Sequence, residues 1–120
     1  MKIILSTAST ELDSAVDPRF GRGAILLVVD TETMQVEAHP NPGVQASGGA
    51  GVQAAQYAAE QKVQAAISGD FGPNAFSALQ AAGIRMYLYG DSTTARQAVE
   101  RFQAGKLQEV GAPTQPGHHG

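Results

Sequence analysis

Apolar and polar residues follow one another in blocks whose lengths and spacing are typical of strands and helices. Five short runs, either continuously apolar or alternating with polar residues, predict strands at residues 3–7, 24–29, 34–38, 63–68 and 85–89. Three longer stretches carry apolar residues at helical spacing and predict helices at residues 49–62, from Pro73 to the residue before Gly83, and from a cap at Asp91 or Ser92 to Gly105.

The order of these segments predicts an α/β fold with three layers. Strands and helices alternate in the second half, which favours right-handed crossovers and parallel strands. The runs 24–29 and 34–38 are separated by polar residues alone and predict a hairpin, so one strand is antiparallel. We expect a mixed five-stranded sheet with helices on both faces, and the alternating run 34–38 at its edge.

Composition narrows the functional classes. The 120 residues suit one domain, which we expect over residues 1–108, followed by a flexible Gly/Pro/His tail over residues 109–120. A formal charge of -3 with 8 Lys and Arg argues against a nucleic-acid partner. No apolar stretch approaches the ~20 residues that cross a membrane, and the N-terminal run is too short for a secretory signal. We therefore expect a cytoplasmic protein without a membrane partner, and the lack of cysteine excludes disulfides and thiolate ligands.

The first of three glycine-rich loops lies between the first two predicted strands. Residues 17–23 read Asp-Pro-Arg-Phe-Gly-Arg-Gly and predict an exposed loop that carries two arginines and an aromatic ring. A guanidinium group stays charged and binds carboxylate or phosphate oxygens through two parallel hydrogen bonds, so Arg19 and Arg22 indicate an anionic ligand. The alternative is a turn whose arginines pair with Asp13 or Asp17.

The other two loops precede helices. Ser47-Gly48-Gly49-Ala50-Gly51 opens the first predicted helix, where unpaired N–H groups and the helix dipole favour negative charge. Residues 69–74, Gly-Asp-Phe-Gly-Pro-Asn, follow a predicted parallel strand, and ligands of open α/β sheets bind beyond such strand ends. The alternatives are a flexible helix start for the former, and for the latter a connection that needs Gly and Pro only for its geometry.

The sequence contains no recognisable catalytic constellation, and we expect no enzyme activity. No serine, histidine and aspartate arrangement includes a nucleophile elbow, and the first strand carries no carboxylate for a two-metal site. His39, His118 and His119 are candidate metal ligands. A loop histidine without a function and a solvated tail are the alternatives.

The three loops together resemble those of the dinitrogenase iron-molybdenum cofactor biosynthesis family. The matching segments are Asp-x-Arg-Phe-Gly-Arg at residues 17–22, Gly-Gly-Ala-Gly at 48–51, and Gly-x-x-Gly-Pro-Asn-Ala at 69–75. The ending Gly-Lys-Leu at 105–107 is also similar, so the resemblance covers residues 1–108. It implies a ribonuclease-H-like fold with sheet order 3-2-1-4-5 and an antiparallel strand 2.

The resemblance also implies a function in nitrogen fixation. A member would be a small, non-catalytic carrier or accessory domain that binds an anionic iron-sulfur or molybdenum-containing cluster, or its precursor, and exchanges it with donor and acceptor proteins as a monomer or weak dimer. The residues predicted to line the binding site are Asp17, Arg19, Phe20, Gly21, Arg22, Ser47, Gly48, Gly49, Ala50, Gly51, Gly72 and Asn74.

Two other functions use the same features. The arginines and backbone N–H groups also suit a module that binds a nucleotide or another organic phosphate. The predicted edge strand 34–38 suits a protein-interaction domain that pairs with a partner or a second copy. A hydrolase has the least support in the sequence.

Overall fold

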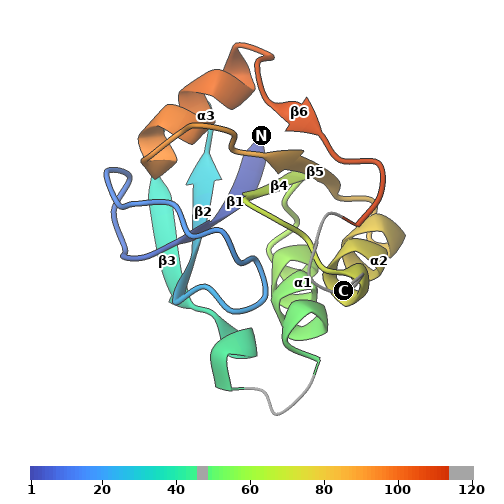
Figure 1. The fold of residues 1–120 in the computed structure, drawn as a ribbon. Helices are drawn as coiled ribbons and strands as arrows, with labels where there is room; N and C mark the ends of the chain where they lie inside the picture. Colours follow the sequence, from blue (N-terminus) through green and yellow to red (C-terminus); the bar gives the residue numbers. More distant parts are fainter. Residues whose placement is uncertain (46–48, 114–120) are drawn as a thin grey trace.

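The computed structural model describes residues 1–45 and 49–113 and has three layers, with one mixed sheet between helices on either face (Figure 1). The strands are β1 (Lys2–Thr7), β2 (Ile25–Asp30), β3 (Val36–Pro40), β4 (Ala65–Ser68), β5 (Arg85–Leu88) and β6 (Gln108–Glu109). The helices are α1 (Ala50–Glu60), α2 (Pro73–Ala81) and α3 (Ala95–Gln103), and a short 3-10 helix, η1, spans Pro42–Gln45.

The sheet order is β3-β2-β1-β4-β5-β6. Strand β1 pairs antiparallel with β2 and parallel with β4, β2 pairs antiparallel with β3, and β4 pairs parallel with β5. The predicted order 3-2-1-4-5 and the antiparallel second strand are thus confirmed, whereas the count of five strands is wrong. The sixth strand was missed because its two residues are polar and exposed, so no apolar pattern marks them. The narrower assignment to a ribonuclease-H-like fold stays a prediction.

The packed part of the chain continues past residue 108, where we expected the tail to begin. Glu109 is the register partner of Tyr87 in the sheet, and the N–H of Val110 donates to the carbonyl of Met86 at 2.8 Å. The Val110 side chain is buried in the core. Residues 109 and 110 therefore belong to the domain, and residues 114–120 of the predicted tail lie outside the described part.

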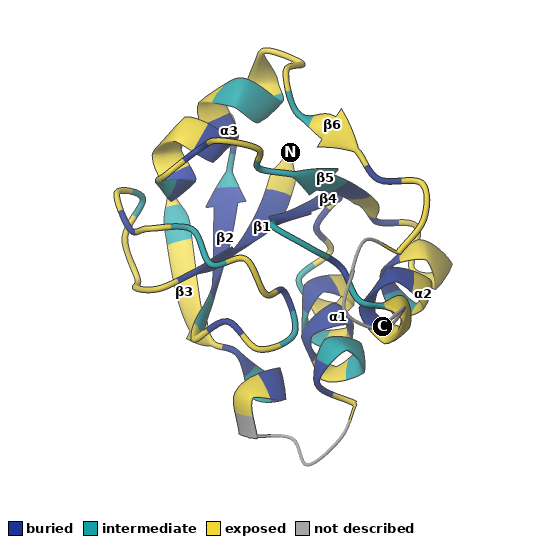
Figure 2. Cartoon of the chain, viewed as in Figure 1, coloured by how far each residue is buried: buried dark blue, intermediate teal, exposed yellow. Residues whose placement is uncertain are grey.

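Two hydrophobic clusters lie on either side of the sheet. Figure 2 shows the buried residues along the central strands and on the helices that cover them. Successive residues of β1 point to opposite faces, so Ile4 packs beneath α1 and α2 while Ile3 and Leu5 pack beneath α3. The buried residues of α1 are all alanines, which allows this helix to lie close to the sheet and to α2. Helix α3 turns apolar residues toward the sheet, since Ala95 and Val99 are fully buried.

The starts of two elements differ from expectation for local reasons. Strand β3 begins at Val36 rather than at residue 34, because Met34 has a φ of 61° and belongs to the turn. Helix α3 is capped by Thr94, whose hydroxyl accepts a hydrogen bond from the N–H of Gln97 at 3.2 Å. The caps expected at Asp91 or Ser92 are wrong. Within the described ranges, no helix combines the length and apolar character needed to span a membrane.

Candidate functional site

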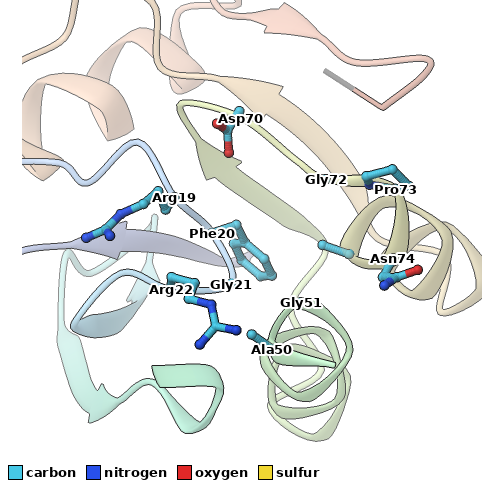
Figure 3. Close-up of a pocket in the computed structure, with 11 residues that line it drawn as sticks. Arg19, Phe20, Gly21, Arg22, Ala50, Gly51, Asp70, Gly72, Pro73 and Asn74 are labelled. Carbon is cyan, nitrogen blue, oxygen red and sulfur yellow. The ribbon is translucent and has the colours of Figure 1, made fainter. Parts of the chain in front are cut away.

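The three glycine-rich loops meet at one cleft of about 230 Å³ (Figure 3). The loop 17–23 forms one wall, and the first turns of α1 and α2 form the other. The residues that line the cleft are Arg19, Phe20, Gly21, Arg22, Ala50, Gly51, Asp70, Gly72, Pro73, Asn74 and Ala75. Segments separated by about 30 and 20 residues in the sequence therefore share one site, as the motifs together suggested.

Most of the predicted site residues border this cleft. Eight of them line it directly: Arg19, Phe20, Gly21, Arg22, Ala50, Gly51, Gly72 and Asn74. Gly49 is the N-cap of α1, directly before Ala50, and Asp17 contacts Arg19. Ser47 and Gly48 lie outside the described residues. Asp70, Pro73 and Ala75 line the cleft but were not among the predicted ligand-binding residues. Their position within the third motif, residues 69–75, could have indicated that they belong to the site.

Both helices that open on the cleft begin without a side-chain cap. Gly49 precedes α1 with a φ of 70°, in the left-handed region that favours glycine, and Gly72 precedes α2; neither supplies a capping hydrogen bond. Neither first turn contains an acidic residue. By contrast, α3 faces away from the cleft and has the Thr94 side chain as its cap. Two positively polarised helix ends thus converge where a negative ligand would be stabilised.

Glycines in all three loops allow the backbones to approach closely. A Cβ on Gly21 would stand 2.9 Å from the nitrogen of Gly51, and a Cβ on Gly51 would stand 2.8 Å from the Cβ of Ala75. A Cβ on Gly69 would stand 2.6 Å from the Cα of Pro18. These glycines are therefore required by packing, and the same packing brings three stretches of backbone to one site.

The loop 17–23 is held in place from inside the domain. Contrary to the expectation of an exposed ring, the Phe20 side chain is 1% exposed and packs against Phe71 with ring centroids 5.5 Å apart. The ring packs in the core beneath α1 and α2. Burying its large apolar surface is favourable, so the ring points into the core although it belongs to a loop. The Nδ2 group of the buried Asn41 donates to the carbonyl of Phe20 at 2.9 Å. No sequence motif pointed to this positioning residue.

The two arginines of the loop have different surroundings. The Nε of Arg19 lies 3.3 Å from Oδ1 of Asp17, and the same oxygen accepts a hydrogen bond from the Arg19 backbone N–H at 2.8 Å. The alternative interpretation, an arginine that pairs with Asp17, is therefore correct for Arg19; Asp13 pairs instead with Arg96. In Figure 3 the guanidinium group of Arg22 lies beside Ala50 at the start of α1.

Asp70 places a carboxyl group at the edge of the same cleft. Its backbone N–H donates to the carbonyl of Pro18 at 2.8 Å, which fixes the third loop against the first. Burial raises the pKa of Asp70 above its ordinary value, and the nearby Asp17 carboxylate raises it further, while Arg19 opposes the shift. The net charge of this wall therefore depends on the protonation of Asp70 and becomes more positive as the pH falls.

The candidate metal ligands are not part of the cleft. His39 lies on the surface, stacked on Tyr57 with ring centroids 4.4 Å apart, and its Nδ1 is 2.8 Å from the carbonyl of Pro40. Residues 1–45 and 49–113 contain no cluster of three or more histidine or carboxylate side chains arranged to hold a metal ion. His118 and His119 lie outside the described residues.

Comparison with known proteins identifies the family. The family described as "Dinitrogenase iron-molybdenum cofactor" matches residues 1–105. The chain belongs to this family. The resemblance found in the three loops is thus confirmed, and it associates this dinitrogenase iron-molybdenum cofactor family member with cofactor biosynthesis or binding, nitrogen fixation and metal clusters.

Two solved structures are similar to this family member over nearly its whole length. The apo form of the orange protein from Desulfovibrio gigas is 41% identical, with a TM-score of 0.90, and the match covers 95% of this chain and 96% of that one. A putative NifB protein from Thermotoga is 30% identical, with a TM-score of 0.82, and the match covers 97% and 98% of the two chains. A search of curated proteins finds no match.

Proposed function

We propose that this chain is a small, non-catalytic carrier that holds an anionic iron-sulfur or molybdenum-containing cluster, or its precursor, as cargo in the cleft of the three loops. Family membership supports the class of cargo. The observation that carries the proposal is the convergence of two helix starts, both without side-chain caps, on one small cleft beside Arg22.

The chemistry of the wall suits a cargo rich in sulfide. The chain has no cysteine, so a cluster would be held without protein thiolate ligands. Sulfide ligands of a metal cluster carry negative charge and accept hydrogen bonds, and hydrogen bonds to cluster sulfurs are among the features through which proteins tune such clusters. Gly51, Asn74 and Ala75 line the cleft within the first turns of their helices, where backbone N–H groups lack intrahelical partners. Arg22, which also lines the cleft, adds a guanidinium group.

The dimensions of the cleft favour a compact ligand. The cleft has a volume of about 230 Å³. This is below the roughly 300–1,000 Å³ that is typical of sites for larger organic ligands. The contacts of Gly21 and Gly51 fix the distance between its walls, since added side-chain atoms would collide with Gly51 and Ala75. A small inorganic anion therefore fits this site better than a whole nucleotide.

Anaerobic titration with a synthetic, thiolate-capped cubane iron-sulfur cluster, and separately with thiomolybdate, tests the proposal. We expect either cargo to shift the NMR signals of the Gly51, Asn74 and Ala75 amides while the Gln97 amide at the capped start of α3 stays in place. Unchanged signals at all three cleft amides with both compounds at millimolar concentration would contradict the proposal.

The second candidate function is the binding of a nucleotide or another organic phosphate. It is favoured by the same helix starts and by the guanidinium group of Arg22, since both bind phosphate oxygens. Thermal denaturation separates the two candidates, because a ligand at 100 times its dissociation constant stabilises the folded state by about 2.7 kcal/mol. Stabilisation by nucleotides, with none by cluster or thiomolybdate, would favour the second function.

The proposed carrier exchanges its cargo with donor and acceptor proteins and works in the cytoplasm. That it performs no reaction of its own is part of the proposal. Hydrolysis of a generic phosphodiester or ester, abolished when Asp70 is replaced by Asn, would show instead that the cleft is an active site.

A further inference from the structure

Strand β3 forms an edge of the sheet on the side remote from β6 (Figure 1). Its residues are exposed from Glu37 to Pro40, as Figure 2 shows. The N–H of Asp30 donates to the carbonyl of Gln35, and the N–H of Asn41 donates to the carbonyl of Ala24, so residues 35 and 41 direct their backbone groups toward β2. Because these directions alternate along an antiparallel strand, the backbone groups of Val36, Ala38 and Pro40 face outward.

The side chains of this strand differ between its two faces. Glu37 and His39 are opposite Val28 and Leu26 of β2, and therefore lie on the face covered by α1, where His39 stacks on Tyr57. The other face carries the apolar residues of the strand, Val36, Ala38 and Pro40. Exposed strand edges with unpaired backbone groups are sites of pairing with another chain.

We propose that β3 pairs antiparallel with β3 of a second copy of this chain, in the register that places Ala38 opposite Ala38. In this register Glu37 of each copy is opposite His39 of the other copy. Each Glu37 carboxylate then has an imidazole ring opposite it rather than a second carboxylate, twice by symmetry, and like charges directly opposite each other are avoided. On the other face Val36 meets Pro40, so apolar residues meet apolar residues.

The backbone supports this register. The outward N–H and C=O of Ala38 exchange both hydrogen bonds with Ala38 of the second copy, and the N–H of Val36 donates to the carbonyl of Pro40. Proline has no N–H to donate, so the ladder ends at Pro40 on both sides. The neighbouring symmetric register, centred on Glu37, would instead place two Glu37 carboxylates opposite each other, which destabilises pairing.

The interface is separate from the proposed cargo site, since no residue of β3 lines the cleft. It is also small, because it joins two strands of 5 residues. Interfaces below roughly 1,200 Å² are typical of weak or transient complexes. The expected dimer therefore forms and dissociates with protein concentration.

Charge exchange between two variants tests the proposal. Glu37→Lys places Lys opposite His39, and His39→Glu places Glu opposite Glu37, so each variant alone loses both Glu37–His39 pairs and the second also repels itself. In a mixture of the two, the mixed dimer restores one Glu37–His39 pair and places the introduced Lys opposite the introduced Glu. In sedimentation velocity, we expect each single variant to raise the dissociation constant of the dimer about five-fold or more, and the mixture to recover it.

Two further variants separate strand pairing from a general effect of charge. Glu100→Lys makes the same charge change at an exposed position of α3 and should leave self-association unchanged. Ala38→Pro removes an outward N–H, which an edge strand tolerates, and should abolish the dimer in a folded chain. A native chain that stays monomeric at millimolar concentration would overturn the proposal and leave the edge to a different partner. So would a dimer that forms without concentration-dependent protection of the Val36 and Ala38 amides from hydrogen exchange.

Discussion

Gly51 of α1 and Ala75 of α2 lie so close that a Cβ on Gly51 would stand 2.8 Å from the Cβ of Ala75 and 3.0 Å from its nitrogen. Each residue belongs to the first turn of its helix. This contact holds the two helix starts side by side, so their backbone N–H groups border the same cleft. The proposed cargo site thus depends on an interhelical distance that only glycine allows.

Replacing Gly51 by Ala should separate these helix starts. Forcing an extra methyl group into a packed contact costs about 1–3 kcal/mol, which outweighs the gain of less than about 1 kcal/mol from the higher helix propensity of Ala. We expect a lower free energy of unfolding in urea and weaker binding of the cubane cluster. Gly111→Ala is the control, since a Cβ there meets no atom within 4 Å. Native stability and affinity in Gly51→Ala would show that the close contact does not define the site.

Replacing Arg22 by Ala should weaken cargo binding. A hydrogen bond to a charged group contributes about 1.5–3 kcal/mol, so the dissociation constant of the cluster should rise roughly 10-fold or more. Arg96→Ala removes the same charge from an exposed ion pair with Asp13, away from the cleft, and should change the affinity little. Isothermal titration under anaerobic conditions measures both, and equal losses in the two variants would indicate a non-specific charge effect.

Replacing Asp70 by Asn should change both stability and binding in a pH-dependent way. Because the pKa of Asp70 is raised by burial in the folded state, ionisation favours unfolding as the pH rises above the ordinary value of 3.8. Asp70→Asn should therefore raise the free energy of unfolding at neutral pH and leave it unchanged below that value. Urea denaturation of both chains across this pH range measures the difference.

The same substitution should strengthen binding of an anionic cargo. An ionised Asp70 repels the cargo, and its pKa is raised above the ordinary value of 3.8, so the native chain should bind more tightly as the pH falls from neutral toward that value. Asp70→Asn should lose much of this difference. Asp91→Asn removes a carboxylate that is 95% exposed and outside the cleft, and serves as the control. A native affinity that increases as the pH rises would refute this role of Asp70.

Replacing Phe20 by Ala should destabilise the domain and displace the loop 17–23 that forms one wall of the cleft. Loss of a fully buried Phe costs about 3–5 kcal/mol of stability, and here it also removes the anchor of the loop 17–23. Phe102→Ala, on the opposite face of the sheet, should lower stability by less and leave the amide signals of the cleft unchanged. Comparable changes at the cleft in both folded variants would indicate that Phe20 has no special connection to the loop.

The sequence predicted most of the fold because burial follows simple periodicities in this chain. Strand β1 is buried from Ile3 to Thr7, and its first three buried residues are a continuous apolar run. Helix α2 begins at Pro73, a residue suited to a first helical turn. It did not predict β6, whose pairing depends on the neighbouring β5 and not on its own residues. Likewise, Thr94 rather than Asp91 or Ser92 caps α3, because several residues before a helix suit this position and tertiary contacts select one of them.

The loops that form the candidate site could be predicted from the sequence, but the contacts of their individual side chains could not. Glycine runs and arginines mark the three segments, and the topology of the sheet brings them together. The burial of Phe20, the hydrogen bond from Asn41 and the pairing of Arg19 with Asp17 depend on distances between segments, which residue spacing does not reveal. The glycines also proved to have a packing role that composition alone does not separate from ligand binding.

The central claim is that two helix starts without side-chain caps bind one negative cargo together. Its most direct test is an anaerobic NMR titration of the native chain with the cubane iron-sulfur cluster, followed at Gly51 of α1 and Asn74 of α2. The account predicts that both amide signals shift in parallel, with one dissociation constant, and that the Gln97 amide of the capped α3 does not. Shifts confined to one helix start, or equal shifts at Gln97, would contradict it.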